Sequence, residues 1–147
     1  GTGMRKESLM EEVKKRNLSN VIFRDSVPKQ EVFKYILASD TGASVLKKVD
    51  TFKTIYSNKT FDYMSCKRPI LLAIDGVSRT LVNDAKCGVY VEPENIDAIV
   101  KGAKELANKS AAEIQQMGEE GYAFARAHFD RDKLAKEYTN KIQGILK

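Results

Sequence analysis

Two kinds of hydrophobic pattern alternate along the chain. Segments with apolar residues three and four positions apart predict amphipathic helices, and short runs of β-branched, aromatic or small apolar residues predict strands. The predicted elements are, in order, a helix over Arg5 to Arg16, a strand over Asn20 to Asp25, a helix after Pro28, a strand over Thr41 to Lys47, a helix around Phe61, a strand over Arg68 to Ile74, a helix bearing Leu81 and Val82, and a strand over Gly88 to Pro93. Strands therefore alternate with helices as far as Pro93.

The run from Arg68 to Ile74 is apolar almost without interruption, as expected of a central strand that is covered on both faces. Alternating strands and helices indicate a parallel sheet with helices on both faces, because parallel strands need crossover connections. The prediction is therefore an α/β fold of the Rossmann-like or flavodoxin-like kind. Such sheets bind ligands beyond the carboxyl ends of their strands. The loops expected to matter are residues 25–29, 47–59, 74–79 and 92–95.

After Asn95 the sequence becomes wholly helical. Asn95 can cap the first of these helices, and the residues Ser-Ala-Ala-Glu from Ser110 to Glu113 form a capping box that begins the next. A last helix is expected from Arg131 to Leu146, which makes residues 110–147 a helical tail. The length fits one domain, so residues 1–147 are predicted to form a single one.

Composition narrows the class of protein. With 42% hydrophobic and 31% charged residues, the chain fits neither a disordered nor a membrane protein, and no apolar run reaches the ~18 residues of a spanning helix. We therefore expect a soluble, cytoplasmic protein. The net charge of +5 favours anionic ligands or a membrane surface. The basic residues are scattered rather than interleaved with exposed aromatic residues, which argues against a nucleic-acid partner.

Residues suited to metal binding are few. Cys66 and Cys87 lack the CxxC spacing of a zinc site, and His128 is the single histidine. Asp130 and Asp132 have the spacing by which some enzymes hold a divalent metal, but both lie where a helix begins, and the helix dipole favours carboxylates there. We expect no metal, no cofactor, and no Ser-His-Asp or Cys-His catalytic set.

The clearest candidate site is the beginning of the helix around Phe61. Ser57 can cap this helix, which leaves the amides of Asn58 and Lys59 partly free at the positive end of the helix dipole. Lys59 adds a cation suited to phosphate, and Asp62 lies about one turn further on the same face. A cation for a diphosphate beside a carboxylate for sugar hydroxyls is what a nucleotide-sugar site needs. The alternative is an ordinary surface ion pair between Lys59 and Asp62.

Four blocks of the sequence, taken in order, resemble one protein family. They are GTGMRKESLMEEVKKRNLSNVIFRDSVPKQEVFKYILASD from residue 1, FKTIYSNKTFDYMSCKRPILLAIDG from residue 52, CGVYVEPENIDAIVKGAKEL from residue 87, and MGEEGYAFARAHFDRDKLAKEY from residue 117. Together they resemble the C-terminal half of retaining glycosyltransferases of the GT-B type, the glycosyl transferases group 1 family. In this family two Rossmann-like halves face each other across a cleft, and the C-terminal half binds the nucleotide-sugar donor. The resemblance implies that residues 1–147 are a nucleotide-sugar-binding domain from a larger two-domain enzyme.

The resemblance also implies a set of donor-binding residues. Asp62 stands where the family has a Glu that holds the nucleotide ribose, and Thr54 stands where many members have a second Glu for the transferred sugar. The beginning of the same helix matches the place of the donor diphosphate. The Asp25 to Pro28 loop matches the backbone that meets the base, and Gly3 matches a glycine near the phosphates. The implied donor-binding residues are Gly3, Val27, Thr54, Ser57, Asn58, Lys59 and Asp62.

The function that the resemblance implies is metal-independent transfer of a sugar from a nucleoside-diphosphate sugar, with retention at the anomeric carbon. The implied acceptor is a glycan or a lipid-linked glycan of cell-surface or capsular polysaccharide synthesis. The family's cationic pair for the leaving diphosphate and its N-terminal acceptor domain lie outside these residues, so this chain alone is expected to be inactive. Peripheral association with the inner face of the membrane is a further expectation for the intact enzyme. The alternatives are half of a nucleotide-sugar epimerase and a noncatalytic Rossmann-like module.

The first residues are also similar to part of the family pattern. Gly1 to Gly3, followed at once by a helix, resemble the glycine turn that normally comes after a first strand, yet no strand precedes them. Either these residues are vector-derived, or the chain is a piece cut just after its first strand. The second interpretation is favoured.

Overall fold

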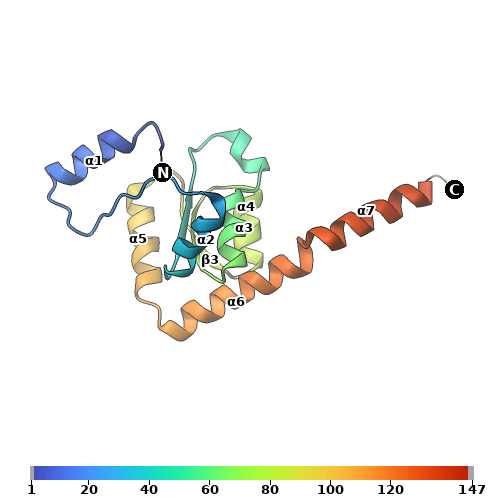
Figure 1. Ribbon diagram of the computed structural model, residues 1–147. Coiled ribbons are helices and arrows are strands. Elements are labelled where there is room, and N and C mark those ends of the chain that lie inside the picture. Colours follow the sequence, from blue (N-terminus) through green and yellow to red (C-terminus); the bar gives the residue numbers. More distant parts are fainter. Residues whose placement is uncertain (1, 146–147) are drawn as a thin grey trace. The chain divides into compact units, whose positions relative to one another are not determined.

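The computed structural model describes residues 2–145 (Figure 1). The chain forms two compact units, Gly1–Tyr35 and Ile36–Lys147. The second unit contains all the strands that the described residues form. It therefore carries the fold that the sequence predicts.

The first unit contains one helix of its own, α1 (Lys6–Lys15), where the apolar spacing predicts it. The expected strand over residues 20–25 is wrong, because these residues form no regular element and Ile22 is 73% exposed. A strand needs a neighbour for its ladder hydrogen bonds, and the described part of this unit contains no other strand. The Lys6 ammonium pairs instead with the Asp25 carboxylate at 2.5 Å. Helix α2 (Lys29–Leu37) begins directly after Pro28, as expected.

Three parallel strands form the sheet of the second unit. They are β1 (Gly42–Val45), β2 (Ile70–Ala73) and β3 (Gly88–Tyr90), in the spatial order β1-β2-β3. Gly42 lies opposite Ile70, which lies opposite Gly88. The apolar strand β2 is central, as its sequence predicts, and three of its four residues are buried.

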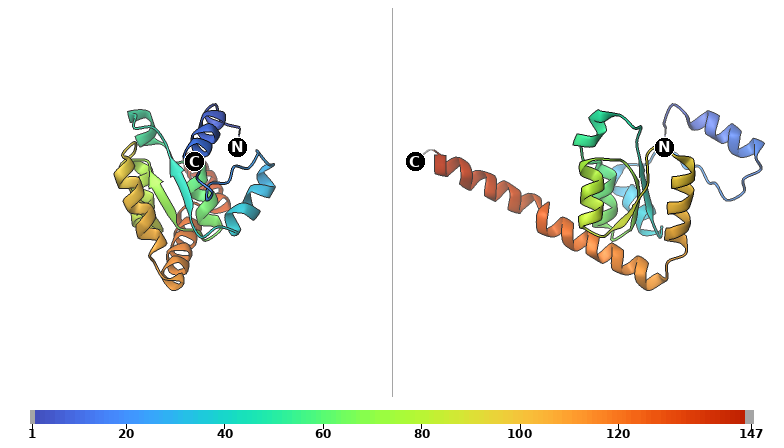
Figure 2. Two further views of the ribbon diagram at one scale, coloured as in Figure 1. Left: turned by 90° about the vertical axis from the view of Figure 1, so that its left-hand side faces the viewer. Right: turned by 180° about the vertical axis from the view of Figure 1, so that it is seen from behind.

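Helices cover both faces of this sheet. Helix α5 (Ile96–Ala107) lies on one face, and α3 (Asn58–Ser65) and α4 (Val77–Asp84) lie on the other (Figure 2). A short 3₁₀ helix, η1 (Asp50–Thr54), lies in the loop between β1 and α3. The second unit is thus a Rossmann-like α/β fold, which confirms the predicted fold class.

The core lies between the sheet and the helices α3, α4 and α6 (Ala111–His128). Met64, Ile70, Leu72 and Val82 are fully buried in it. Helix α6 approaches this core through glycine, since a Cβ atom on Gly121 would lie only 2.7 Å from the Cβ of Cys87. The close approach of α6 lets Phe124 and Ala125 pack against the core.

The helical tail follows its predicted pattern. Helix α6 begins with the expected capping box, in which the Glu113 amide donates to the Ser110 hydroxyl and the Glu113 carboxylate accepts from the Ser110 amide. Helix α7 (Arg131–Ile145) follows after a break and has no buried residues (Figure 1). The expected last residue, Leu146, lies outside the described residues. Within residues 2–145, no helix has the length and apolar character needed to cross a membrane.

Candidate functional site

The loops that follow the three strands lie at one end of the sheet, because parallel strands end on the same side. The loop after β1 runs through η1 to the beginning of α3. The loop after β2 contains Asp75 and Gly76, and the loop after β3 contains Glu92 and Glu94. A hydrogen bond of 3.1 Å from the Ser44 hydroxyl of β1 to the Ser57 hydroxyl ties the beginning of α3 to this end of the sheet.

Ser57 occupies the N-cap position of α3, but its side chain makes no capping hydrogen bond, so that part of the prediction is wrong. The reason lies in β1. Ser44 is 1% exposed and its buried hydroxyl needs an acceptor, which the Ser57 oxygen supplies. The first amides of α3 therefore have no side-chain cap at the positive end of the helix dipole.

The side chains in the first turns of α3 have the charges of the predicted site. Asn58 and Lys59 are exposed, and the first turn contains no acidic residue that would neutralise the Lys59 charge. Asp62 is half-buried one turn further on. This arrangement presents backbone amides and an ammonium group to an anion, with a carboxylate about 5 Å along the helix axis.

The other predicted donor-binding residues lie elsewhere along the chain. Thr54 is the last residue of η1, exposed, and its hydroxyl donates to the Thr51 carbonyl at 3.1 Å. Gly3 and Val27 belong to the first compact unit. The Gly3 carbonyl accepts from the Lys6 amide at 2.9 Å, and Val27 is half-buried. The structure thus places Asn58, Lys59 and Asp62 on α3, with Ser57 at its N-cap and Thr54 shortly before it.

A charged network at the same end of the sheet was missed by sequence reasoning. The Lys48 ammonium pairs with the Glu92 carboxylate, which also accepts from the Tyr90 hydroxyl at 3.0 Å. The Arg79 guanidinium lies 4.3 Å from the centre of the Tyr90 ring and 3.5 Å from the Asp75 carboxylate. No spacing in the sequence could reveal the whole network, because its members come from three different loops, from β3 and from α4.

These contacts shift the pKa values of the network. The Lys48 ammonium, and then the Tyr90 hydroxyl, lower the pKa of the Glu92 carboxyl, and Glu92 in turn raises the pKa of Lys48. The pKa of Asp75 is lowered mainly by the hydrogen bond from the Gly76 amide. The ionised Glu92 carboxylate therefore links the loops after β1 and β3, and the Arg79 side chain links α4 with β3.

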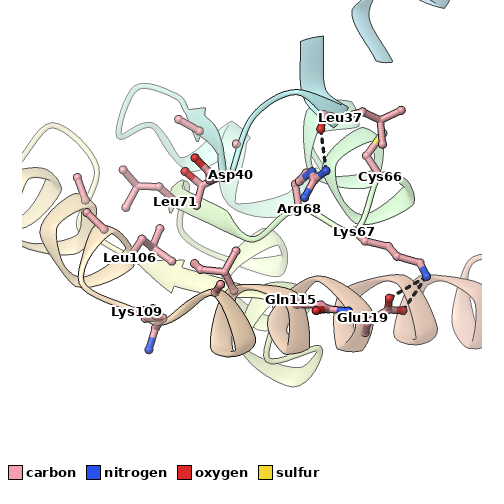
Figure 3. A pocket seen from close by; sticks show the side chains of 17 residues that line it. Leu37, Asp40, Cys66, Lys67, Arg68, Leu71, Leu106, Lys109, Gln115 and Glu119 are labelled. Atoms are coloured by element: carbon pink, nitrogen blue, oxygen red, sulfur yellow. Dashed lines mark hydrogen bonds and ion pairs between the residues drawn. The ribbon is translucent and has the colours of Figure 1, made fainter. Parts of the chain in front are cut away.

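A cavity of about 990 Å³ lies at the opposite end of the sheet, where β1 and β2 begin (Figure 3). Alanine and leucine residues from α5, β1 and β2 form much of its wall. The Arg68 guanidinium at its rim donates to the Leu37 carbonyl at 2.7 Å, and the Lys67 ammonium pairs with the Glu119 carboxylate at 2.8 Å (Figure 3). The cavity is large, but its Arg68 and Lys67 side chains already bind protein groups. The beginning of α3 instead has backbone amides without a side-chain cap and an exposed lysine, so it is the better candidate for an anion site.

Asp130 caps helix α7, and Asp132 lies in the first turn of that helix. One Asp130 carboxylate oxygen accepts from the amides of Asp132 and Lys133 at 3.1 Å each, at the beginning of α7. Among residues 2–145, no group of three or more His, Cys, Asp or Glu side chains is arranged to hold a metal ion.

A scan against protein-family models matches none, and a search of curated proteins finds no significant match for this chain. The functional interpretation therefore depends on the residues of the chain itself.

Proposed function

We propose that this chain is the donor-binding domain of a glycosyltransferase that uses a nucleoside-diphosphate sugar. The observation that carries the proposal is the beginning of α3. It lies at the carboxyl end of a parallel sheet, has no side-chain cap, and presents the exposed Lys59 and the half-buried Asp62. Parallel α/β sheets bind ligands at this end, and uncapped helix N-termini bind phosphates.

In the proposed complex, the donor diphosphate lies against the amides of Asn58 and Lys59, and the Lys59 ammonium neutralises part of its charge. Asp62 accepts hydrogen bonds from the ribose hydroxyls, and Thr54 offers a hydroxyl to the transferred sugar. The likeness of the sequence to retaining GT-B enzymes supports these roles. Asp62 is one methylene shorter than the Glu of that family, so the ribose must lie closer to α3.

The proposed enzyme transfers the sugar, without a metal ion, to a glycan or lipid-linked acceptor in polysaccharide synthesis. Transfer requires an acceptor domain beyond these residues, so the chain alone binds the donor without turning it over. An acceptor carried by a lipid places the intact enzyme at the inner face of a membrane, as a peripheral protein. The net charge of +5 is compatible with that surface.

Replacing Lys59 tests the phosphate contact. Lys59→Met removes the charge and keeps much of the side-chain volume, so UDP or GDP should bind about tenfold or more weakly by calorimetry, since a hydrogen bond to a charged group is worth roughly 1.5–3 kcal/mol. Lys104→Met, which removes an exposed lysine of α5, should leave the affinity unchanged and serves as the control. Equal affinities for the wild type and Lys59→Met would contradict the proposed phosphate contact.

Replacing Asp62 tests the ribose contact. The wild-type chain should bind UDP more tightly than 2′-deoxy-UDP, and Asp62→Asn should reduce that preference because the amide is a weaker acceptor than the carboxylate. Far-UV circular dichroism and the melting temperature should remain near those of the wild type. If Asp62→Asn unfolds the chain instead, Asp62 has a structural role and the ribose assignment is wrong.

A further inference from the structure

The break between α6 and α7 is short and its hydrogen bonds are satisfied on both sides. Phe129 leaves the helical conformation, with φ −129° and ψ 17°, and its amide donates to the Ala125 carbonyl at 2.8 Å as the last bond of α6. Asp130 then caps α7. Two residues therefore set the direction in which α7 leaves the domain (Figure 1).

The Phe129 ring packs against two rings, Tyr56 from the loop before α3 and Phe61 from α3 itself, and its centre lies 6.5 Å from that of the Phe124 ring of α6. The Phe129 ring centre lies 5.5 Å from that of Tyr56, at an interplanar angle of 77°, and 5.0 Å from that of Phe61. Tyr56 and Phe61 lie 5.7 Å apart at 68°. Edge-to-face pairs at these distances are favourable beyond the area they bury. Tyr56, Phe61 and Phe129 thus form a cluster in which each ring contacts the other two, so a shift of one ring changes the packing of both others.

Two of these rings lie next to the beginning of α3. Tyr56 directly precedes the N-cap residue Ser57 and is 45% exposed, whereas Phe61 lies within α3 and packs against the core. The cluster therefore connects the α6–α7 break with the loop that enters α3. Beyond the break, the described contacts of α7 with α6 include one hydrogen bond, from the Lys133 ammonium to the Ala127 carbonyl at 3.1 Å.

We propose that the aromatic cluster of Tyr56, Phe61 and Phe129 couples the direction of α7 to the conformation of the loop over residues 50–57. Helix α7 has 15 residues and is therefore about 22 Å long, so a small rotation at Phe129 displaces its far end by several times as much as the ring. The coupling acts in both directions, because an energetic coupling between two parts of a molecule is reciprocal. It goes beyond the proposed function, since it needs no ligand.

Hydrogen exchange of the full chain, followed by mass spectrometry, tests this coupling. Phe129→Leu should speed exchange of the amides of residues 50–60 by about three- to tenfold, and Tyr56→Leu should speed exchange of residues 129–135 to a similar extent. Tyr138→Leu replaces an exposed ring of α7 outside the cluster and should change neither segment. If Phe129→Leu changed exchange only in residues 129–135, and Tyr56→Leu only in residues 50–60, the proposal would be overturned.

A double substitution separates coupling from general destabilisation. In the chain that carries Tyr56→Leu, adding Phe129→Leu should speed exchange of residues 50–60 much less than it does in the wild type, because the contact between Phe129 and Tyr56 is already lost and only the contact with Phe61 remains. Additive effects of the two substitutions, or a uniform increase over all amides, would overturn the coupling. Tyr56 is 45% exposed, so Tyr56→Leu should fold. If Phe129→Leu does not fold, the exchange of residues 129–135 in Tyr56→Leu still tests the coupling. A chain that binds no nucleotide but shows the reciprocal exchange would contradict the proposed function and leave the coupling intact.

Discussion

At the scale of single residues, glycines determine how closely backbone segments approach one another near the candidate site. Gly76, in the loop after β2, has φ +79°, and a Cβ atom there would overlap the Lys53 carbonyl of η1. The absence of a side chain at Gly76 lets η1 lie against the loop that follows β2. The position of Thr54, at the end of η1, therefore depends on a glycine in a different loop.

Replacing Gly76 should destabilise the fold. Gly76→Ala combines an unfavourable φ with a backbone overlap, so the free energy of unfolding should fall by roughly 2 kcal/mol or more in a denaturant titration. Gly144→Ala is the matched control, because a Cβ atom there meets nothing within 4 Å and alanine favours the helix, so stability should stay the same or rise by up to about 1 kcal/mol. Similar losses in both variants would show that Gly76 has no special role.

At the scale of elements, the sequence signals were most reliable where local chemistry decides the structure. Asn95 accepts from the Ala98 amide at 3.0 Å and begins α5, and the Ser110 capping box begins α6, both as predicted. Ser57 is an equally suitable capping residue but does not cap α3. Its hydroxyl oxygen accepts a hydrogen bond from the buried Ser44 hydroxyl of β1 instead. That competition depends on tertiary structure, which the sequence does not display.

The capping box of α6 can be tested directly. Ser110→Ala removes the acceptor for the Glu113 amide, and the free energy of unfolding should fall by about 1 kcal/mol. Ser110→Thr keeps a hydroxyl at this position and should change stability much less. If denaturant titrations show equal stability for Ser110→Ala and the wild type, the cap contributes nothing measurable to the fold.

The expected strand over residues 20–25 shows the limit of pattern reasoning for elements. Its β-branched and aromatic residues suit a strand as well as those of β3 do, yet only β3 has a neighbouring strand in the structure. Strand propensity reflects packing against neighbours more than a preference of the backbone alone. A single sequence segment therefore cannot reveal whether its partner is present.

At the scale of the whole molecule, the parallel sheet and its covering helices were predictable, but the contacts between loops were not. The alternation of apolar strands with amphipathic helices permits few arrangements, and the structure has one of them. The network of Lys48, Glu92 and Tyr90, and the cavity beside Arg68, form only when distant segments meet. Lys59 and Asp62 could be proposed from the sequence, whereas this network had to be found from the structure.

The buried Cys87 thiol makes the stability of the domain depend on pH. Burial raises the pKa of Cys87 from 9.0 to about 12, so the folded state keeps the thiol proton at pH values where the unfolded state has lost it. Above pH 9 a rise in pH therefore favours unfolding, with a slope of up to about 1.4 kcal/mol per pH unit as far as pH 12. Below pH 9 this contribution is fully present.

Denaturant titrations between pH 8 and pH 11 check this dependence. The wild type should lose stability more steeply with pH than Cys87→Ala, because other groups, such as the half-buried Tyr63, titrate in both chains. The native thiol should also resist alkylation at neutral pH, since its thiolate is scarce and its side chain is buried. Identical pH slopes in the two chains would show that burial does not raise the pKa of Cys87 as described.

The central claim is that a nucleoside diphosphate binds at the beginning of α3, and amide chemical shifts of the full ¹⁵N-labelled chain during titration with UDP and GDP test its location most directly. We predict saturable shifts for the amides of Asn58 and Lys59, with smaller changes around Asp62, and much weaker shifts with uridine, which lacks the phosphates. Shifts that instead surround the cavity at Thr41 and Arg68, or an absence of shifts at millimolar nucleotide, would contradict the claim.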